Sequence, residues 1–356
     1  MNQQRLQKVL DNMKQAGLRQ LLVTETEPVY YLTGIWVSPM ERMMALYIRE
    51  DGKVTFFGNK LFAIAPQEGL EMVEHTDSDD PVAQLAAAVL PGELGIDETW
   101  PSRFLIGLMS HRPDVKPVLG SGPVAQATMY KDEEERELMR AASRIDDACI
   151  DMAIHAIREG ITEKELSSKV EHFFQEKGCD HLGFSIVAMG ANGADPHHGT
   201  DGTVLKEGDS IVMDIGAPFN HYWCDMTRTV FYKSASEEQR TVYETVRRAN
   251  EAAIAVVKPG VAFKEIDLAA RKVIEDAGYG EYFTHRTGHS IGMKEHEQPP
   301  VSSECEVIAK PGMIFSIEPG IYLPGKFGVR VEDLVLVTED GCEVLNKYPK
   351  DLIVVE

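Results

Sequence analysis

The sequence predicts an α/β (α+β) protein with two domains: a mixed α/β domain over residues 1–126, and a second domain with pseudo-twofold symmetry over residues 127–356. Three observations support this. The chain has 356 residues, more than one compact core usually holds. Its first third alternates short apolar runs with helical patterns. The remainder contains a repeat with an offset of 100 residues.

Composition excludes several classes of partner. The formal net charge is -21, from 57 acidic and 36 basic residues, so nucleic acid and anionic membranes are disfavoured. The segment Met1–Arg5 leads into no apolar run of the signal-peptide kind, and no apolar stretch is long enough to span a bilayer. The five cysteines form no CxxC pair, which is typical of reduced thiols. We therefore expect a cytoplasmic protein.

The first domain begins with an amphipathic helix whose apolar face is Leu6, Val9, Leu10 and Met13. Helical patterns separate short apolar runs, which predicts a mixed sheet. The candidate strands are Gln20–Thr24, Met44–Ile48, Val54–Phe57 and Glu93–Ile96. The charged run 131–136 then opens a long helical pattern that reaches Ile157, and we place the domain boundary just before it.

The second domain reads as two duplicated halves. Residues 159–166 match residues 259–266, and each matched helix is closed by a glycine, Gly178 or Gly278. The first copy starts with a capping-box pattern. Further along, residues 206–216 and 310–320 share the pattern K-x-G-x5-[D/E]-x-G. Each half is thus expected to hold two helices followed by antiparallel strands, with a carboxylate at the same place in each.

Four carboxylates occupy mirrored places in these halves. Asp225 follows Asp214 by 11 residues and Glu332 follows Glu318 by 14, with turn residues between apolar strands in both cases. Hairpin pairing would bring the members of each pair together, and pseudo-twofold packing would make the pairs face each other. A single such acid most often ends a strand or caps a turn. Four in one cleft repel one another and favour two divalent cations about 3.5–4 Å apart.

Histidines add a second group of candidates. His289 lies between glycines in a segment where backbone can approach a bound group, and His285, His296 and His197 lie in similar loop-like stretches. Imidazole beside carboxylates favours manganese, iron, cobalt or zinc over calcium. The functions of two further histidines, His198 and His221, stay open. The sequence has no GxSxG, P-loop or HExxH motif, and Cys224 is expected to be a buried apolar thiol, not a nucleophile.

These residues resemble the pita-bread metallopeptidases, especially proline dipeptidase (prolidase) and aminopeptidase P. The Asp, Asp, His, Glu, Glu set of that family is present without substitution. The segments that look like family motifs are Met213–Gly216, Gly288–Gly292, Glu318–Tyr322 and Arg330–Asp333. The first domain resembles the creatinase-type N-terminal domain, most clearly at Tyr31–Gly34.

The resemblance implies how two metal ions are held. Asp214 would hold one ion, His289 and Glu318 would hold the other, and Asp225 and Glu332 would bridge them. Manganese is the ion we expect first, with cobalt, zinc and iron as alternatives. By the same resemblance the chain would form a homodimer.

The resemblance also implies roles at the substrate. Glu318 would act as the base, and His296 would stabilise the developing oxyanion with a metal. Residues expected to contact or line the substrate are His197, His296, His285, Arg330 and Tyr322. Ser290 departs from the family motif at a place where glycine is commoner, which bears on the geometry of this loop.

The expected substrate is a small peptide with proline in second position. A dipeptidase is favoured, because Ser38–Arg42 looks more like dipeptidases than aminopeptidases. An aminopeptidase P acting on longer peptides is the alternative. A metal-free creatinase-like hydrolase or a non-catalytic binding protein of the same fold is a second alternative, which retention of all five ligands argues against.

Overall fold

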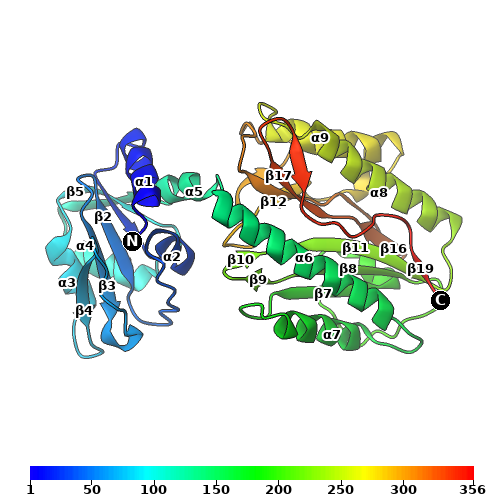
Figure 1. Cartoon of the computed structure of the whole chain (residues 1–356), viewed down its shortest axis with the longest axis horizontal. Helices are drawn as coiled ribbons and strands as arrows, with labels where there is room; N and C mark the ends of the chain where they lie inside the picture. Colours follow the sequence, from blue (N-terminus) through cyan, green and yellow to red (C-terminus); the bar gives the residue numbers. More distant parts are fainter. The chain divides into compact units, whose positions relative to one another are not determined.

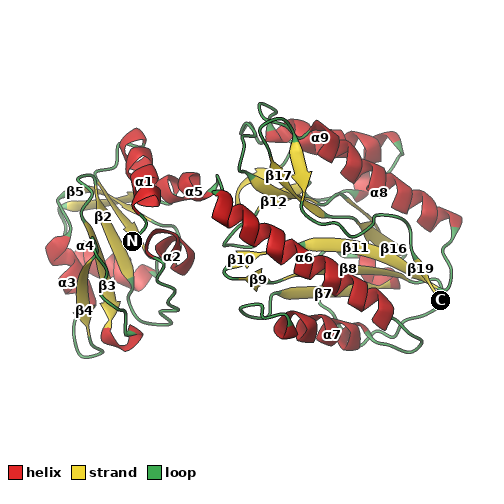
Figure 2. Cartoon of the chain, viewed as in Figure 1, coloured by secondary structure: helices red, strands yellow, loops and turns green.

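The computed structural model describes all residues from 1 to 356. The chain divides into two compact units, Met1–Thr128 and Met129–Glu356 (Figure 1). Both units combine helices with strands (Figure 2). This confirms the predicted α/β class.

The first unit is built on a six-stranded mixed sheet in the order β4-β3-β2-β1-β5-β6. The pairs β1–β2 and β2–β3 are antiparallel, and the other three pairs are parallel. Its strands are β1 (Gln20–Val23), β2 (Ala45–Arg49), β3 (Val54–Asn59), β4 (Glu71–His75), β5 (Gly92–Ile96) and β6 (Val115–Leu119). Its helices are α1 (Gln3–Gln15), α2 (Thr26–Thr33), η1 (Lys60–Phe62), α3 (Pro81–Ala88), α4 (Ser102–His111) and α5 (Gly122–Thr128).

The first helix follows the predicted amphipathic pattern. The side chain of Asn2 caps α1 by accepting a hydrogen bond from the backbone N–H of Arg5. Leu6, Val9 and Met13 are buried, as side chains three and four residues apart on one helical face should be.

The second unit contains a four-stranded sheet in the order β19-β11-β8-β7 and a five-stranded sheet in the order β13-β12-β14-β17-β18. It also contains two short two-stranded ribbons, β9–β10 and β15–β16. Its helices are α6 (Glu133–Ala156), α7 (Glu163–Glu176), η2 (Gly190–Ala194), α8 (Glu237–Val256), α9 (Phe263–Asp276) and η3 (Gly280–Tyr282). The strands of its first half are β7 (Phe184–Met189), β8 (Ser210–Gly216), β9 (Pro218–Phe219), β10 (Tyr222–Trp223) and β11 (Met226–Tyr232). The remaining strands are β12 (Gly288–Ser290), β13 (Glu297–Val301), β14 (Ile314–Ile317), β15 (Gly320–Leu323), β16 (Phe327–Arg330), β17 (Asp333–Val337), β18 (Cys342–Val344) and β19 (Val354–Val355).

The predicted duplication is confirmed. The bounds of α7 and α9 differ by 100 residues at both ends. Gly178 and Gly278 follow these helices in the left-handed region, with φ of 78° and 83°. Isolated bridges precede both helices at matching places, Thr162 with Val204 and Ala262 with Ile308. Each half also inserts a short ribbon between its two main antiparallel strands.

Each half has its own apolar core. Helices α6 and α7 pack on β7, β8 and β11 through one buried cluster, and α8 and α9 pack on β14 to β17 through another. All five cysteines are free, and Cys224 is fully buried, as expected for an apolar thiol. No helix is long and apolar enough to cross a membrane.

Candidate metal centre

The first pair of carboxylates comes from the strands β8 and β11. These strands are antiparallel, and Asp214 lies opposite Thr227. Asp225 precedes Thr227 by two residues, and side chains two apart on a strand point to the same face. The ribbon β9–β10 fills the connection, turning at Asn220 and His221, whose φ angles are 49° and 69°. Both carboxylates line one cavity as a result.

The second pair comes from β14 and β17 in the same manner. Ile317 lies opposite Asp333 in the antiparallel register. Glu318 follows Ile317 and Glu332 precedes Asp333, so the two carboxylates adjoin and line the same cavity. The ribbon β15–β16 forms the predicted hairpin across residues 324–326.

Backbone contacts join the two halves beside these carboxylates. The N–H of Glu332 donates to the carbonyl oxygen of Thr227 at 3.1 Å. The hydroxyl of Thr229 accepts from the N–H of Arg330 at 3.1 Å and donates to its carbonyl at 2.9 Å. Strands β11 and β16 therefore lie side by side (Figure 1). The pseudo-twofold packing expected from the repeat brings the four acids together.

His289 completes the group of five. Its Nε2 lies 3.4 Å from Oδ2 of Asp225 and 3.6 Å from Oε1 of Glu318. Its Nδ1 lies 3.2 Å from the carbonyl oxygen of Ser290, which can only accept, so Nδ1 carries the proton. In the neutral ring this leaves the Nε2 lone pair directed at the carboxylates, as a metal ligand requires.

The donor set fits divalent cations. Ligand atoms of Asp225, His289 and Glu332 all lie within 4.8 Å of one another. The Oδ1 atom of Asp214 is buried and has no hydrogen-bond partner, while its Oδ2 accepts from Arg330 at 2.6 Å. A buried carboxylate oxygen without a partner is costly unless an ion satisfies it.

Mutual repulsion and burial disturb the acids of this group. Burial raises the pKa of Asp225 well above its ordinary value, and the charge of Asp214 adds to the effect. Burial, and then the charge of Asp225, raises the pKa of Glu332 in the same direction. Burial raises the pKa of Glu318 to about 7, while the nearby charge of Arg330 opposes the rise. Divalent cations would offset all of these costs.

Three side chains hold these acids in place, and the sequence drew attention only to the first. Arg330 is 3% exposed; its Nε donates to the hydroxyl of Thr227 at 3.1 Å. That hydroxyl donates to Oε2 of Glu332 at 2.7 Å. The hydroxyl of Ser316 accepts from the N–H of His289 at 3.0 Å and lies 3.2 Å from Oε1 of Glu318. Such supports fix ligand orientation.

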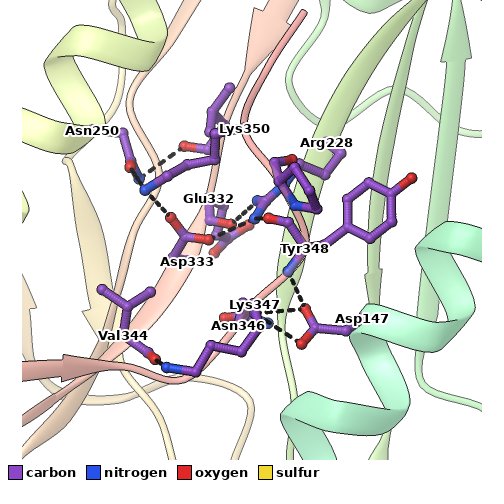
Figure 3. Close-up of polar contacts among 12 residues, drawn as sticks. Asp147, Arg228, Asn250, Glu332, Asp333, Val344, Asn346, Lys347, Tyr348 and Lys350 are labelled. Carbon is purple, nitrogen blue, oxygen red and sulfur yellow. Dashed lines mark hydrogen bonds and ion pairs between the residues drawn. The ribbon is translucent and has the colours of Figure 1, made fainter. Parts of the chain in front are cut away.

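A buried ionic cluster also holds the backbone of Glu332 in place (Figure 3). Arg228 donates to the carbonyl oxygen of Glu332 at 2.6 Å and to Oδ1 of Asp333 at 2.7 Å. Lys350 donates to Oδ2 of Asp333 and to Oδ1 of Asn250, both at 2.8 Å. The C-terminal segment is thereby bonded to Asp333, which begins β17 and directly follows Glu332.

A chain of hydrogen bonds leads from Arg330 to His285. Nη1 of Arg330 donates to the hydroxyl oxygen of Tyr322 at 2.9 Å. Nε2 of His285 lies 2.8 Å from the same hydroxyl, and its Nδ1 lies 2.7 Å from the carbonyl of Arg286. Burial, with the charge of Arg330, lowers the pKa of His285 to about 4, so the ring is neutral and Tyr322 donates to it.

The cavity measures about 190 Å³. Four of the residues predicted to meet the substrate line it: His197, His285, His296 and Arg330. The fifth, Tyr322, does not line the cavity but bonds to His285 and Arg330. The ring of His296 is about half exposed and lies 3.9 Å from that of His289, centroid to centroid. Burial lowers the pKa of His296 to about 4.

Sequence reasoning missed five lining residues: Phe184, Ile186, Pro196, Arg286 and Glu295. Pro196, Arg286 and Glu295 are each next to a predicted histidine in the sequence, and this adjacency could have identified them. Phe184 and Ile186 alternate on β7, so they share a face. Of the histidines left open, His198 bonds to Glu163 and His221 to Asp180, and neither lines the cavity. Ser290 is buried, and its hydroxyl donates to the carbonyl of Pro299 at 2.8 Å.

Both units of the chain are similar to known proteins. Residues 137–339 match the description of metallopeptidase family M24, and residues 5–128 match the Creatinase/Prolidase N-terminal domain. An uncharacterized peptidase of Staphylococcus aureus (strain MSSA476) is 34% identical over 97% of this chain and 99% of its own. A dipeptidase structure from Pyrococcus horikoshii OT3 has 35% identity and a TM-score of 0.94, covering 98% of this chain and 99% of its own. A prolidase structure from Thermococcus sibiricus has 34% identity, a TM-score of 0.94 and 99% coverage of both chains.

Proposed function

The chain belongs to metallopeptidase family M24, and from this premise we propose that its second unit is a dinuclear-metal hydrolase of Xaa-Pro dipeptides. One observation carries the proposal. Mirrored strands of the two halves bring four carboxylates and one imidazole to a single cavity, where an oxygen of Asp214 is buried without a partner. The named dipeptidase and prolidase relatives support the choice of substrate.

The ion-holding residues would be Asp214, Asp225, His289, Glu318 and Glu332. When bound, two divalent cations would polarise the peptide carbonyl and lower the pKa of water near them. We infer manganese as the ion, since carboxylate oxygens with one imidazole suit it. Plasma emission analysis of manganese-reconstituted protein should find two ions per chain, and a reconstituted protein without divalent ions would rule out this mechanism.

Within the cavity, Glu318 is suited to move a proton. It lines the cavity as a partly buried carboxylate, and a carboxylate in this place can accept a proton from water and release it to the leaving nitrogen. The imidazoles of His296 and His197 line the cavity and can donate N–H groups to the oxygen that gains charge in the transition state. Arg330 and Tyr322 keep His285 in one orientation beside them.

The size of the cavity favours a small substrate. Its volume of about 190 Å³ is below the range of roughly 300–1,000 Å³ typical of pockets for drug-sized ligands. A dipeptide suits such a space better than a longer chain does. The Xaa-Pro bond lacks an N–H, so a site for it needs no acceptor at that nitrogen.

A peptide-length series with added manganese tests the proposal. We expect Ala-Pro to be cleaved efficiently, Ala-Pro-Ala and longer peptides to be cleaved poorly, and Ala-Ala to be a weak substrate. The Glu318→Gln variant should lose at least about a hundredfold in kcat. Efficient cleavage of the longer peptides would replace the dipeptidase by an aminopeptidase P, and cleavage without metal would contradict both.

We also infer from the family resemblance that the chain forms a homodimer. Multi-angle light scattering should give a mass of about twice 39.6 kDa. A monomeric mass in an active preparation would contradict this inference.

A further inference from the structure

The loop that carries His197 to the cavity has little regular structure of its own. It leaves β7 after Met189, forms the short turn η2, and runs on to Asp201. Within it, the N–H of His197 bonds to the side chain of Asp195 at 3.0 Å, and the N–H of His198 bonds to the Asp195 carbonyl at 3.2 Å. These contacts are local and do not fix the loop to the rest of the unit.

One buried carboxylate joins both ends of the loop, in addition to the bonds that Thr200 makes to Ser185 and Val187 of β7. Glu163, the first residue of α7, is fully buried and accepts four hydrogen bonds from the loop. Its Oε1 accepts from the N–H of Met189 at 2.8 Å and from Nδ2 of Asn192 at 2.9 Å. Its Oε2 accepts from the N–H of Asp201 at 2.9 Å and from Nε2 of His198 at 2.8 Å. Both ends and the middle of the loop thus meet at one side chain.

The neighbours of His197 are anchored on opposite sides. Pro196 precedes it, and its carbonyl oxygen accepts from Nη1 of Arg330 at 3.4 Å. His198 follows it and bonds to Glu163. A residue between two anchored neighbours has little freedom of backbone movement, so the place of the His197 ring in the cavity depends on both anchors.

The same cluster does not suit a cation. Glu163, His198 and Asp201 lie close enough together to hold one. However, all four contacts to the Glu163 carboxylate come from N–H groups, and N–H dipoles that point at a carboxylate repel a metal ion. Oδ1 of Asp201 is also engaged, by the N–H of Thr203 at 2.7 Å. The cluster is a set of charge-assisted hydrogen bonds, which are stronger than neutral ones.

We propose that Glu163 is a positioning residue for His197: its carboxylate holds the loop so that the His197 ring meets the substrate in the cavity. This inference rests on the proposed function, because His197 matters to turnover only if the cavity is the site of cleavage. It gives the Glu163–His198 hydrogen bond a role in turnover, although neither side chain lines the cavity. A loss of position of about 1 Å can cost a catalytic site up to roughly a hundredfold in rate.

The test is a double-mutant cycle with a matched control. Glu163→Gln keeps the shape of the side chain but points an amide N–H₂ at two of the four donors, which breaks their bonds. Glu165→Gln is the control, because this exposed glutamate lies in the same helical turn and bonds only to Thr162. We expect Glu163→Gln to lower kcat/KM by roughly tenfold and Glu165→Gln to change it less than about twofold.

In a His197→Ala background the effect of Glu163→Gln should shrink to less than about twofold, because the group that it positions is gone. An equal loss in both backgrounds would overturn the proposal, since it would show that Glu163 acts through overall stability. Unchanged kcat/KM in folded Glu163→Gln would overturn it as well. Should Glu163→Gln fail to fold, His198→Phe is used instead, because it removes one of the four bonds. A loss of kcat/KM that appears when His197 is present and disappears in the His197→Ala background supports the same conclusion.

A measurement of loop order separates this inference from the proposed function. Amide hydrogen exchange of residues 189–201 should rise at least about tenfold in Glu163→Gln and stay unchanged in Glu165→Gln. This readout needs no substrate. If wild-type protein cleaves no Xaa-Pro peptide, the proposed function fails while faster exchange still supports the anchoring; unchanged exchange would overturn the anchoring even in an active enzyme.

Discussion

Replacing Glu318 by glutamine should stabilise the metal-free protein at alkaline pH, although Glu318 is proposed as a ligand and a base. The pKa of this partly buried carboxylate is raised from 4.5 to about 7, chiefly by desolvation. One pH unit of difference corresponds to about 1.4 kcal/mol, so an ionised Glu318 at pH 8 costs the folded chain about 3 kcal/mol. A glutamine side chain avoids that cost while keeping nearly the same shape.

The sign follows from proton binding. The folded state of the metal-free protein binds the Glu318 proton more tightly than the unfolded state does, so stability falls as pH rises from about 4.5 through about 7. The advantage of the glutamine variant should therefore be about 1 kcal/mol at pH 5 and about 3 kcal/mol at pH 8. Manganese should reverse the order at pH 8, because the ions neutralise the carboxylate.

Urea unfolding in the presence of a chelator measures the difference. Trp223 is the one tryptophan of the second unit, so a Trp36→Phe, Trp100→Phe background lets fluorescence report that unit alone. The exposed Glu339→Gln change is the control and should alter stability equally at both pH values. The reasoning is refuted if Glu318→Gln destabilises the metal-free protein at pH 8, or if its effect is the same at pH 5 and pH 8.

Two further substitutions probe the supports of the site. Tyr322→Phe leaves Nε2 of partly buried His285 without its partner, so it should lower the free energy of unfolding by about 1–3 kcal/mol and reduce kcat/KM. Unchanged values in urea unfolding and peptide assays would argue against that chain of hydrogen bonds. Lys350→Met leaves fully buried Asp333 with one cationic partner fewer. We expect it to lower the free energy of unfolding in urea by about 2 kcal/mol, against less than about 0.5 kcal/mol for the exposed Lys347→Met control. Equal effects of the two substitutions would disprove the role of the cluster.

The sequence by itself determined the elements and the ionisable groups. Strand and helix periodicity is local, and so are turn signals, which is why the repeat, the hairpin strands and the glycine helix stops agree with the structure. Placing Asp214 and Glu318 in equivalent places of duplicated halves was enough to expect four acids in one cleft. That step needed symmetry alone, because a duplicated unit buries matching faces against each other.

Only the tertiary structure decided how those groups are held. Arg330, Thr227 and Glu332 form one hydrogen-bonded unit, although more than a hundred residues separate Thr227 from the other two along the chain. Nothing in the sequence drew attention to Glu163, whose carboxylate accepts hydrogen bonds from Met189 and His198 at the loop that carries His197. Such contacts join segments that no periodic pattern relates. Their partners are chosen by packing, and a one-dimensional sequence does not record which side chains packing brings within hydrogen-bond distance.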